Sequence, residues 1–162
     1  MGRSHIIVAL DFACINQARA FVSLLSPDTC CLKVGKQMFT LYGPSFVNEC
    51  VDLGFDVFLD LKFHDIPNTV SAAVLAAAQL GVWMQTLHIQ GGVEMLAAAC
   101  SARDSFVGRK PLLVGVTMLT SLSDEDVSVL GYSSSVEAMV LRYAQLAFDV
   151  GLDGVVCSAF EA

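Results

Sequence analysis

Residues 60–69 read Asp-Leu-Lys-Phe-His-Asp-Ile-Pro-Asn-Thr and follow the apolar run Val57-Phe58-Leu59. The apolar run predicts a buried β-strand, and side chains alternate across a strand, so Asp60 and Lys62 are expected to point the same way. With Asp65, they place two acids and a base where the strand leaves the core, and an α/β barrel carries its catalytic groups at that end of its strands. A structural ion pair is the alternative interpretation of these charges.

A loop and a helix are predicted to follow this strand. Pro67 has no backbone N–H and disfavours a helical conformation at Ile66, so the chain is expected to leave the strand in a loop. Asn68 or Thr69 is then expected to cap a helix that begins at Val70.

Composition and charge limit the class of protein. The 162 residues are 55% hydrophobic and 15% charged, which fits a single globular domain, residues 1–162, with a large buried core. The formal net charge of −7 argues against a nucleic-acid partner. No apolar run approaches the roughly 18 residues that a membrane helix requires and no signal peptide is visible, so we expect a cytoplasmic protein without a membrane segment.

The sequence shows no pattern typical of a metal or nucleotide site. The cysteines, at positions 14, 30, 31, 50, 100 and 157, fall in apolar stretches without CxxC spacing and are expected to be buried structural thiols. The histidines, at 5, 64 and 88, lack metal-ligand spacing, and no glycine-rich phosphate loop is present. Any chemistry is therefore expected to use neither a metal nor a cofactor held by a recognisable motif.

Strands and helices are predicted to alternate along the chain. The expected strands are 6–10, 30–34, 57–62, 84–89, 112–117 and 154–157; the expected helices are 18–25, 43–53, 70–80, 93–102 and 136–150, with a polar loop at 120–128. This alternation implies a parallel sheet, and the continuous apolar strands imply burial on both faces.

Polar side chains recur at or near the carboxyl ends of the expected strands: Asp11, Lys33, Asp60 with Lys62, His88, Thr117 and Thr120, and Ser158. An open doubly wound sheet also binds ligands at this edge. A barrel is favoured because at least five strands contribute and no glycine-rich turn follows the first. A (β/α)₈ TIM barrel needs eight units and typically about 250 residues, so we expect an incomplete barrel of about six βα units and a truncated chain.

Four segments carry a resemblance to a known family: Val8–Asp11, Leu32–Lys36, Asp60–Thr69 and Val116–Ser121. In this order they resemble bacterial orotidine 5′-phosphate decarboxylases, and Gly151–Ser158 extends the likeness over essentially the whole chain. The resemblance implies a homodimeric (β/α)₈ barrel that converts orotidine 5′-monophosphate to uridine 5′-monophosphate and CO₂ in pyrimidine biosynthesis, without metal or cofactor.

The resemblance also implies a role for each charged residue. Lys62 is the implied proton donor to the pyrimidine carbon that loses CO₂, and Asp60 would lie beside the departing carboxylate. Lys33 would hold Asp60 and a ribose hydroxyl, while Asp11 would bind the ribose.

Other residues are implied to act across a dimer or at the base. Asp65, with Ile66 and Thr69, would reach into the partner's site, and Thr120 would contact the pyrimidine. His64 is expected to make a structural hydrogen bond within the motif. The complete set of implied substrate contacts is Asp11, Lys33, Asp60, Leu61, Lys62, Phe63, His64, Asp65, Ile66, Pro67, Asn68, Thr69 and Thr120.

The charges suit such a reaction. Decarboxylation leaves a carbanion, so the site must stabilise developing negative charge and supply a proton, and carboxylates beside a lysine favour its ammonium form. A carboxylate near that of the substrate raises the energy of the ground state, and departure of CO₂ relieves it. Because the protein is net negative, local cations must bind a dianionic ester.

Two features depart from the family pattern. Ile89 is larger than the small residue usual after the motif histidine, and is expected to repack the fourth strand. The sequence also stops before the seventh and eighth strands, which in the family supply the glutamine, glycine and arginine that bind phosphate.

Two other interpretations stay open. One is a related sugar-phosphate decarboxylase or aldolase on the same barrel, such as a keto-gulonate-phosphate decarboxylase or a hexulose-phosphate synthase, with acidic metal ligands. The other is a non-catalytic fragment that folds partly or only within an assembly.

Overall fold

Six parallel strands form one sheet in the computed structural model, which describes residues 6–159 and 161. The strands follow one another in sequence order: β1 (Ile7–Leu10), β2 (Cys31–Gly35), β3 (Val57–Phe63), β4 (Met84–His88), β5 (Leu112–Val116) and β6 (Gly154–Val156). Each strand pairs in parallel with the next. The parallel sheet predicted from the alternation of elements is confirmed.

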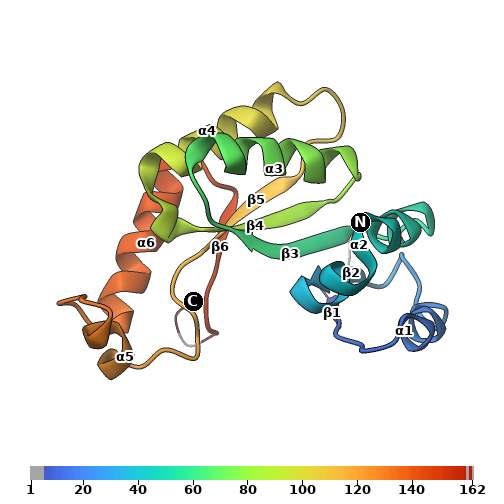
Figure 1. Ribbon diagram of the computed structural model, residues 1–162, viewed down its shortest axis with the longest axis horizontal. Coiled ribbons are helices and arrows are strands. Elements are labelled where there is room, and N and C mark those ends of the chain that lie inside the picture. The colour runs from blue at the N-terminus through green and yellow to red at the C-terminus, as the bar shows by residue number, and fades with distance from the viewer. Residues whose placement is uncertain (1–5, 160, 162) are drawn as a thin grey trace.

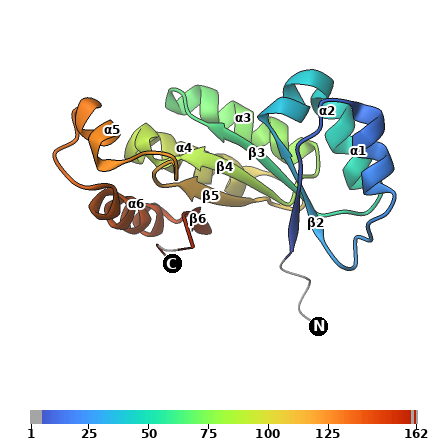
Figure 2. The same cartoon turned by 90° about the horizontal axis from the view of Figure 1, so that it is seen from below.

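Helices connect successive strands. They are α1 (Ile15–Val22), α2 (Lys36–Asp52), α3 (Pro67–Gln79), the 3₁₀ turn η1 (Ile89–Gly91), α4 (Gly92–Ser105), α5 (Asp124–Val129) and α6 (Val136–Val150). Figure 1 shows the sheet curling so that these helices surround its outer side, and Figure 2 shows the strands following one another from β2 to β6. The arrangement is an incomplete (β/α) barrel of about six units, as the sequence predicts.

The strand register assigns side chains to the two faces of the sheet. Lys33 pairs with Phe58, and Phe58 pairs with Met84, so these three side chains share the inner face. The outer face is apolar, and residues such as Leu32 and Leu59 pack there with α1 and α2 in a fully buried cluster. The core therefore lies between sheet and helices, and the inner face is left to carry the polar residues at the carboxyl ends of the strands.

Three helices begin at least three residues earlier than the sequence predicts, and the first of them, α1, runs from Ile15 to Val22 where residues 18–25 were expected. Helix α3 starts at Pro67, with Ile66 as its N-cap and no side-chain capping bond, so the predicted cap at Asn68 or Thr69 is wrong. Proline suits the first helical position because the N–H it lacks has no intrahelical partner there. Helix α2 starts at Lys36, and the expected start near residue 43 corresponds to a kink at Gly43, where φ is 63°.

The polar segment at 120–128, expected to be a loop, contains helix α5 from Asp124 to Val129. Ser123 caps it by accepting the Asp126 N–H, and the Asp126 carboxylate accepts the Ser123 N–H in return. The helix was missed because its sequence is polar, although a serine three residues before an acid is a capping-box signal.

Most of the cysteines are buried thiols, as predicted, but Cys14 is exposed and Cys157 is only half-buried. Cys14 lies in the turn before α1, as its N-cap residue, and not within a packed strand or helix. Among the described residues, no helix combines the length and apolar character needed to cross a membrane.

The unusual isoleucine after β4 is accommodated by a glycine on the next strand. Ile89 is completely buried. A Cβ atom placed on Gly115 of β5 would lie 2.6 Å from two carbon atoms of Ile89 and 2.9 Å from Leu152 Cδ1. Ile89 therefore packs directly over Gly115, and this packing depends on the absence of a side chain at position 115.

Gly115→Ala is expected to destabilise the protein by about 1–3 kcal/mol, because overpacking a filled core forces side chains out of their preferred rotamers. Adding Ile89→Val should recover part of that loss, so the double variant should be more stable than additivity predicts. Unfolding midpoints in urea would measure both effects. Gly154→Ala is the matched control, since its new Cβ would meet only Val114 at an ordinary 3.7 Å. Equal losses at the two glycines would contradict this account.

Candidate active site

The inner face carries a bulge in β3 at the acid–base motif. Leu59 pairs with Gln85 and Phe63 with Leu87, so β3 has extra residues between two nearby positions of β4. Lys62 lies in this bulge with φ 55°, the left-handed region that residues other than glycine seldom adopt. The regular alternation predicted for this strand is therefore interrupted, although Asp60 and Lys62 do meet on the same side. Bulges of this kind re-aim side chains and are frequent beside active sites.

Asp60 is the centre of an ion cluster. Its Oδ1 accepts a hydrogen bond from Lys62 Nζ at 2.7 Å, and its Oδ2 lies 3.5 Å from Lys33 Nζ. Thr86 of β4 donates from its hydroxyl to Asp60 Oδ1 at 3.1 Å. Three neighbouring strands thus converge on one carboxylate at the carboxyl edge of the sheet.

The cluster keeps Asp60 ionised. Burial by itself would raise the pKa of Asp60, but the hydrogen bond and charge of Lys62, the charge of Lys33 and the hydrogen bond from Thr86 together hold that pKa below its usual value. An ionised Asp60 carboxylate is therefore present at neutral pH, and the side chains of Asp60, Lys33 and Lys62 are only 14–24% exposed.

Asp11 lies beside this cluster at the end of β1. A Cβ atom on Gly35 would come within 3.4 Å of Lys33 Nζ and 3.7 Å of Asp11 Oδ1, so both charged groups stand over the same backbone position. A side chain at position 35 would crowd the lysine, and glycine leaves this edge of the site open. The structure thus brings together four of the predicted residues: Asp11, Lys33, Asp60 and Lys62.

Asp65 is placed differently. It is exposed in the loop between β3 and α3, where its Oδ1 accepts the Ile66 N–H at 2.7 Å. No cation among residues 6–159 and 161 pairs with it, so the structure does not join it to the Asp60 cluster of its own chain. Ile66, next to it, is an apolar side chain that is 66% exposed.

The loop that carries Asp65 borders a cavity. Its lining combines the loop with the turn after β4: an open depression of about 520 Å³ is lined by His64, Asp65, Ile66, Pro67, Gln90 and Gly91. His64 makes a ring contact with His88, with centroids 5.4 Å apart, in place of the hydrogen bond expected of it. Burial, then the nearby charges of His64, Lys36 and Lys62, lower the pKa of His88, and Asp60 opposes the shift, so His88 is neutral at pH 7.

The remaining predicted residues lie around this centre without joining the ion cluster. Leu61 and Phe63 are half-buried and pack into the outer-face core. Asn68 and Thr69 are exposed on the first turn of α3, and Thr120 is exposed in the turn after β5. Their implied contacts with substrate stay predictions.

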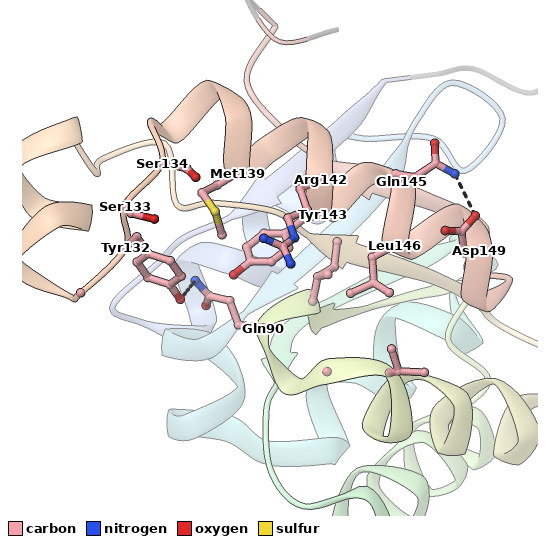
Figure 3. A pocket seen from close by; sticks show the side chains of 14 residues that line it. Gln90, Tyr132, Ser133, Ser134, Met139, Arg142, Tyr143, Gln145, Leu146 and Asp149 are labelled. Atoms are coloured by element: carbon pink, nitrogen blue, oxygen red, sulfur yellow. Dashed lines mark hydrogen bonds between the residues drawn. The ribbon is translucent and has the colours of Figure 1, made fainter.

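A further cavity of about 760 Å³ lies beside α6 (Figure 3), and neither Lys33, Asp60 nor Lys62 lines it. In this cavity Gln90, from the turn after β4, donates to Tyr132 Oη at 3.5 Å and contacts Met118 Sδ at 3.6 Å. The contact ties the turn after β4 to the segment after β5. Sequence reasoning did not single out this pair.

Thr86 is the functional candidate that the sequence prediction missed. Thr86 stands two positions before His88 in β4, which reads Met-Gln-Thr-Leu-His, and that spacing puts it on the same face as His88, whereas Gln85 points to the other face. The signal was available, but the strand was interpreted from its end residues alone. Within the part of the chain that the structure describes, no group of three or more histidine, cysteine or acidic side chains is placed to hold a metal ion.

Comparison with known proteins agrees with this geometry. The sequence model of the "Orotidine 5'-phosphate decarboxylase / HUMPS family" matches residues 4–162. An orotidine 5′-phosphate decarboxylase of Baumannia cicadellinicola is 57% identical over 159 residues, which cover 98% of this chain and 64% of the relative. One from Vibrio cholerae serotype O1 is 54% identical over 162 residues, which cover 100% of this chain and 70% of the relative.

Solved structures show the same fold. An orotidine 5′-phosphate decarboxylase from Lactobacillus acidophilus superposes with a TM-score of 0.91 at 36% identity, covering 99% of this chain and 73% of that one. An uncharacterized conserved protein from Geobacillus kaustophilus gives 0.92 at 39% identity, covering 97% and 75%. The chain belongs to the orotidine 5′-phosphate decarboxylase / HUMPS family. It spans 64–70% of the length of these two curated relatives.

Proposed function

We propose that this chain provides the charged centre of an orotidine 5′-phosphate decarboxylase, which converts orotidine 5′-monophosphate to uridine 5′-monophosphate and CO₂ in pyrimidine biosynthesis. The observation that carries the proposal is the cluster in which Asp60 binds the ammonium groups of Lys62 and Lys33 at the carboxyl edge of a parallel sheet. Membership of the family supports the same reaction.

Lys62 acts as the proton donor in this proposal. The C–C bond to the substrate carboxylate breaks, CO₂ leaves, and the electron pair stays on the ring carbon. The ammonium of Lys62, already held by Asp60 at 2.7 Å, stabilises that charge and transfers its proton to the carbon. Asp60 stands beside the substrate carboxylate, and loss of CO₂ relieves the repulsion between them.

The neighbouring charges bind the sugar. Lys33 keeps Asp60 in place and donates to a ribose hydroxyl, and Asp11 accepts from the ribose. Their common position over Gly35 supports this division, because both groups reach the same open edge of the site.

A second copy of the chain completes the site. Asp65, Ile66 and Thr69 reach into the partner's site in a homodimer. The exposure of Ile66 and the absence of a cation beside Asp65 among the described residues support this role, since both groups are free to meet another chain.

A sugar-phosphate decarboxylase or aldolase on the same barrel is the alternative function, and the DxK motif alone fits it. Magnesium dependence separates the two functions. Turnover of orotidine 5′-monophosphate that persists in excess EDTA favours the proposed decarboxylase, whereas activity on a sugar phosphate that requires Mg²⁺ favours the alternative.

The test needs a closed barrel. We define the completed barrel as residues 1–162 joined to the segment of the Vibrio cholerae relative that lies beyond the matched region. We expect the completed barrel to decarboxylate orotidine 5′-monophosphate. The loss of substrate absorbance measures the rate of this reaction. A well-folded completed barrel without turnover would contradict the proposed function.

The 162-residue polypeptide alone is expected to be nearly inactive and to associate. Among the described residues, β1 and β6 are the edge strands of the sheet and each pairs with one neighbour, and Ile7 and Val156 on them are each 37% exposed. Size-exclusion chromatography and the same assay would measure this. A monodisperse monomer with the kcat/KM of the completed barrel would show that the strands supplied by the added segment are dispensable.

A further inference from the structure

We infer that Thr86 is a positioning residue that holds the backbone of Lys62 in its left-handed conformation and directs Asp60 toward the lysine ammonium. The inference rests on the proposed function for its catalytic meaning. Thr86 is completely buried in the middle of β4, on the strand next to the bulge.

One hydroxyl makes both contacts. Thr86 Oγ1 accepts a hydrogen bond from the Lys62 N–H at 2.8 Å and donates one to Asp60 Oδ1 at 3.1 Å. A hydroxyl can do this because it has one proton to donate and lone pairs that accept. The backbone of the proposed proton donor and the carboxylate that orients its side chain are thereby fixed to a single atom.

At the bulge, the Lys62 N–H bonds to the side chain of Thr86 and not to a backbone carbonyl of β4. Between the Leu59–Gln85 and Phe63–Leu87 pairs, the register shifts and Lys62 adopts φ 55°. A lysine in that conformation persists only where its surroundings hold it. The Thr86 hydroxyl satisfies the Lys62 N–H at this point, so we assign the conformation of Lys62 to this hydrogen bond.

The Thr86 hydroxyl also fixes the position of the Lys62 ammonium group, through the Asp60 carboxylate. Asp60 Oδ1 receives both the Thr86 hydroxyl and Lys62 Nζ, so rotation of the carboxylate would break two contacts at once. Loss of the hydroxyl would free the carboxylate to turn and the bulge to relax. A displacement of about 1 Å in a reacting group can cost about 10²-fold in rate.

Thr86→Val tests the inference because it keeps the shape of the side chain and removes the hydroxyl. In the completed barrel we expect kcat to fall by about 10²-fold with a much smaller change in KM, and Thr86→Ser to restore most of kcat. NMR titration of the Asp60 carboxyl, in the completed barrel and in the 162-residue chain, is expected to show a higher pKa in the valine variant and the parental pKa in the serine variant.

Thr117→Val is the matched control. Thr117 is just as buried, and its hydroxyl donates to the Val156 carbonyl at 3.2 Å, away from the ion cluster. This variant should lose stability without a change in kcat or in the Asp60 titration.

The outcomes separate the inference from the proposed function. If Thr86→Val behaves as Thr117→Val does, losing only stability, the inference is overturned. If the valine variant does not fold, Thr86→Ala and Thr86→Ser carry the test, and equal kcat and Asp60 titration in those two overturn it. If the parental completed barrel has no turnover, the proposed function fails, and the Asp60 titration alone still decides whether Thr86 positions the cluster.

Discussion

Lys62→Ala in the completed barrel is expected to lower kcat by about 10²–10⁴-fold, the usual cost of losing a general acid, while nucleotide binding stays measurable. The substitution removes the ammonium that Asp60 binds at 2.7 Å, and no other cation lies as close to that carboxylate among the described residues. Lys33, at 3.5 Å, remains and keeps part of the charge balance. Single-turnover kinetics and equilibrium binding of uridine 5′-monophosphate would separate the two effects.

Lys110→Ala provides the control for this experiment. Lys110 is an exposed lysine before β5, where it donates to the Asp104 carbonyl at 2.6 Å, at the opposite end of the strand from the ion cluster. It should retain parental kcat. A Lys62→Ala variant within tenfold of the parental kcat would remove the assignment of Lys62 as proton donor.

Mixing two inactive variants is expected to restore activity. If Asp65 serves the partner's site, a dimer of one Lys62→Ala chain and one Asp65→Ala chain contains one site with both groups intact. Equal mixing gives about half mixed dimers, so about a quarter of the parental activity should return if the dimer has twofold symmetry. The assay follows activity against time after mixing, with subunit exchange verified by mass-tagged chains.

The control mixes Lys62→Ala with Asp60→Ala. Asp60 and Lys62 pair within one chain, so no mixed dimer of these two variants can hold an intact site, and activity should stay absent. No recovery with Asp65→Ala after complete exchange would argue that Asp65 acts within its own chain.

Much of the fold was predictable because burial decides it. The six apolar strands, the parallel order and the convergence of polar residues at one edge follow from alternation and hydrophobicity, and the structure confirms them. Element starts were less predictable: α3 begins at Pro67, and α5 forms in a polar segment through a local capping box. Local hydrogen bonds and backbone preferences determine where a helix begins, and the pattern of hydrophobic residues does not contain this information.

The candidate site was predictable in its residues more than in its geometry. Asp60 and Lys62 could be paired from their spacing, but the bulge between them and the Thr86 hydroxyl that stabilises it depend on pairing with β4. The position of Asp65 away from the cluster likewise depends on the course of the loop. Contacts between strands set these details, and a single strand's sequence does not contain them.

The left-handed backbone at Lys62 has a consequence for engineering this protein. An ordinary residue in that region costs roughly 1–2 kcal/mol, and glycine avoids most of that cost. A library selected for thermal stability alone would therefore favour glycine at position 62 and would discard the ammonium group with the strain. Stability favours glycine at position 62, whereas the proposed chemistry requires lysine there. A screen for stable variants of this chain should therefore keep Lys62 unchanged.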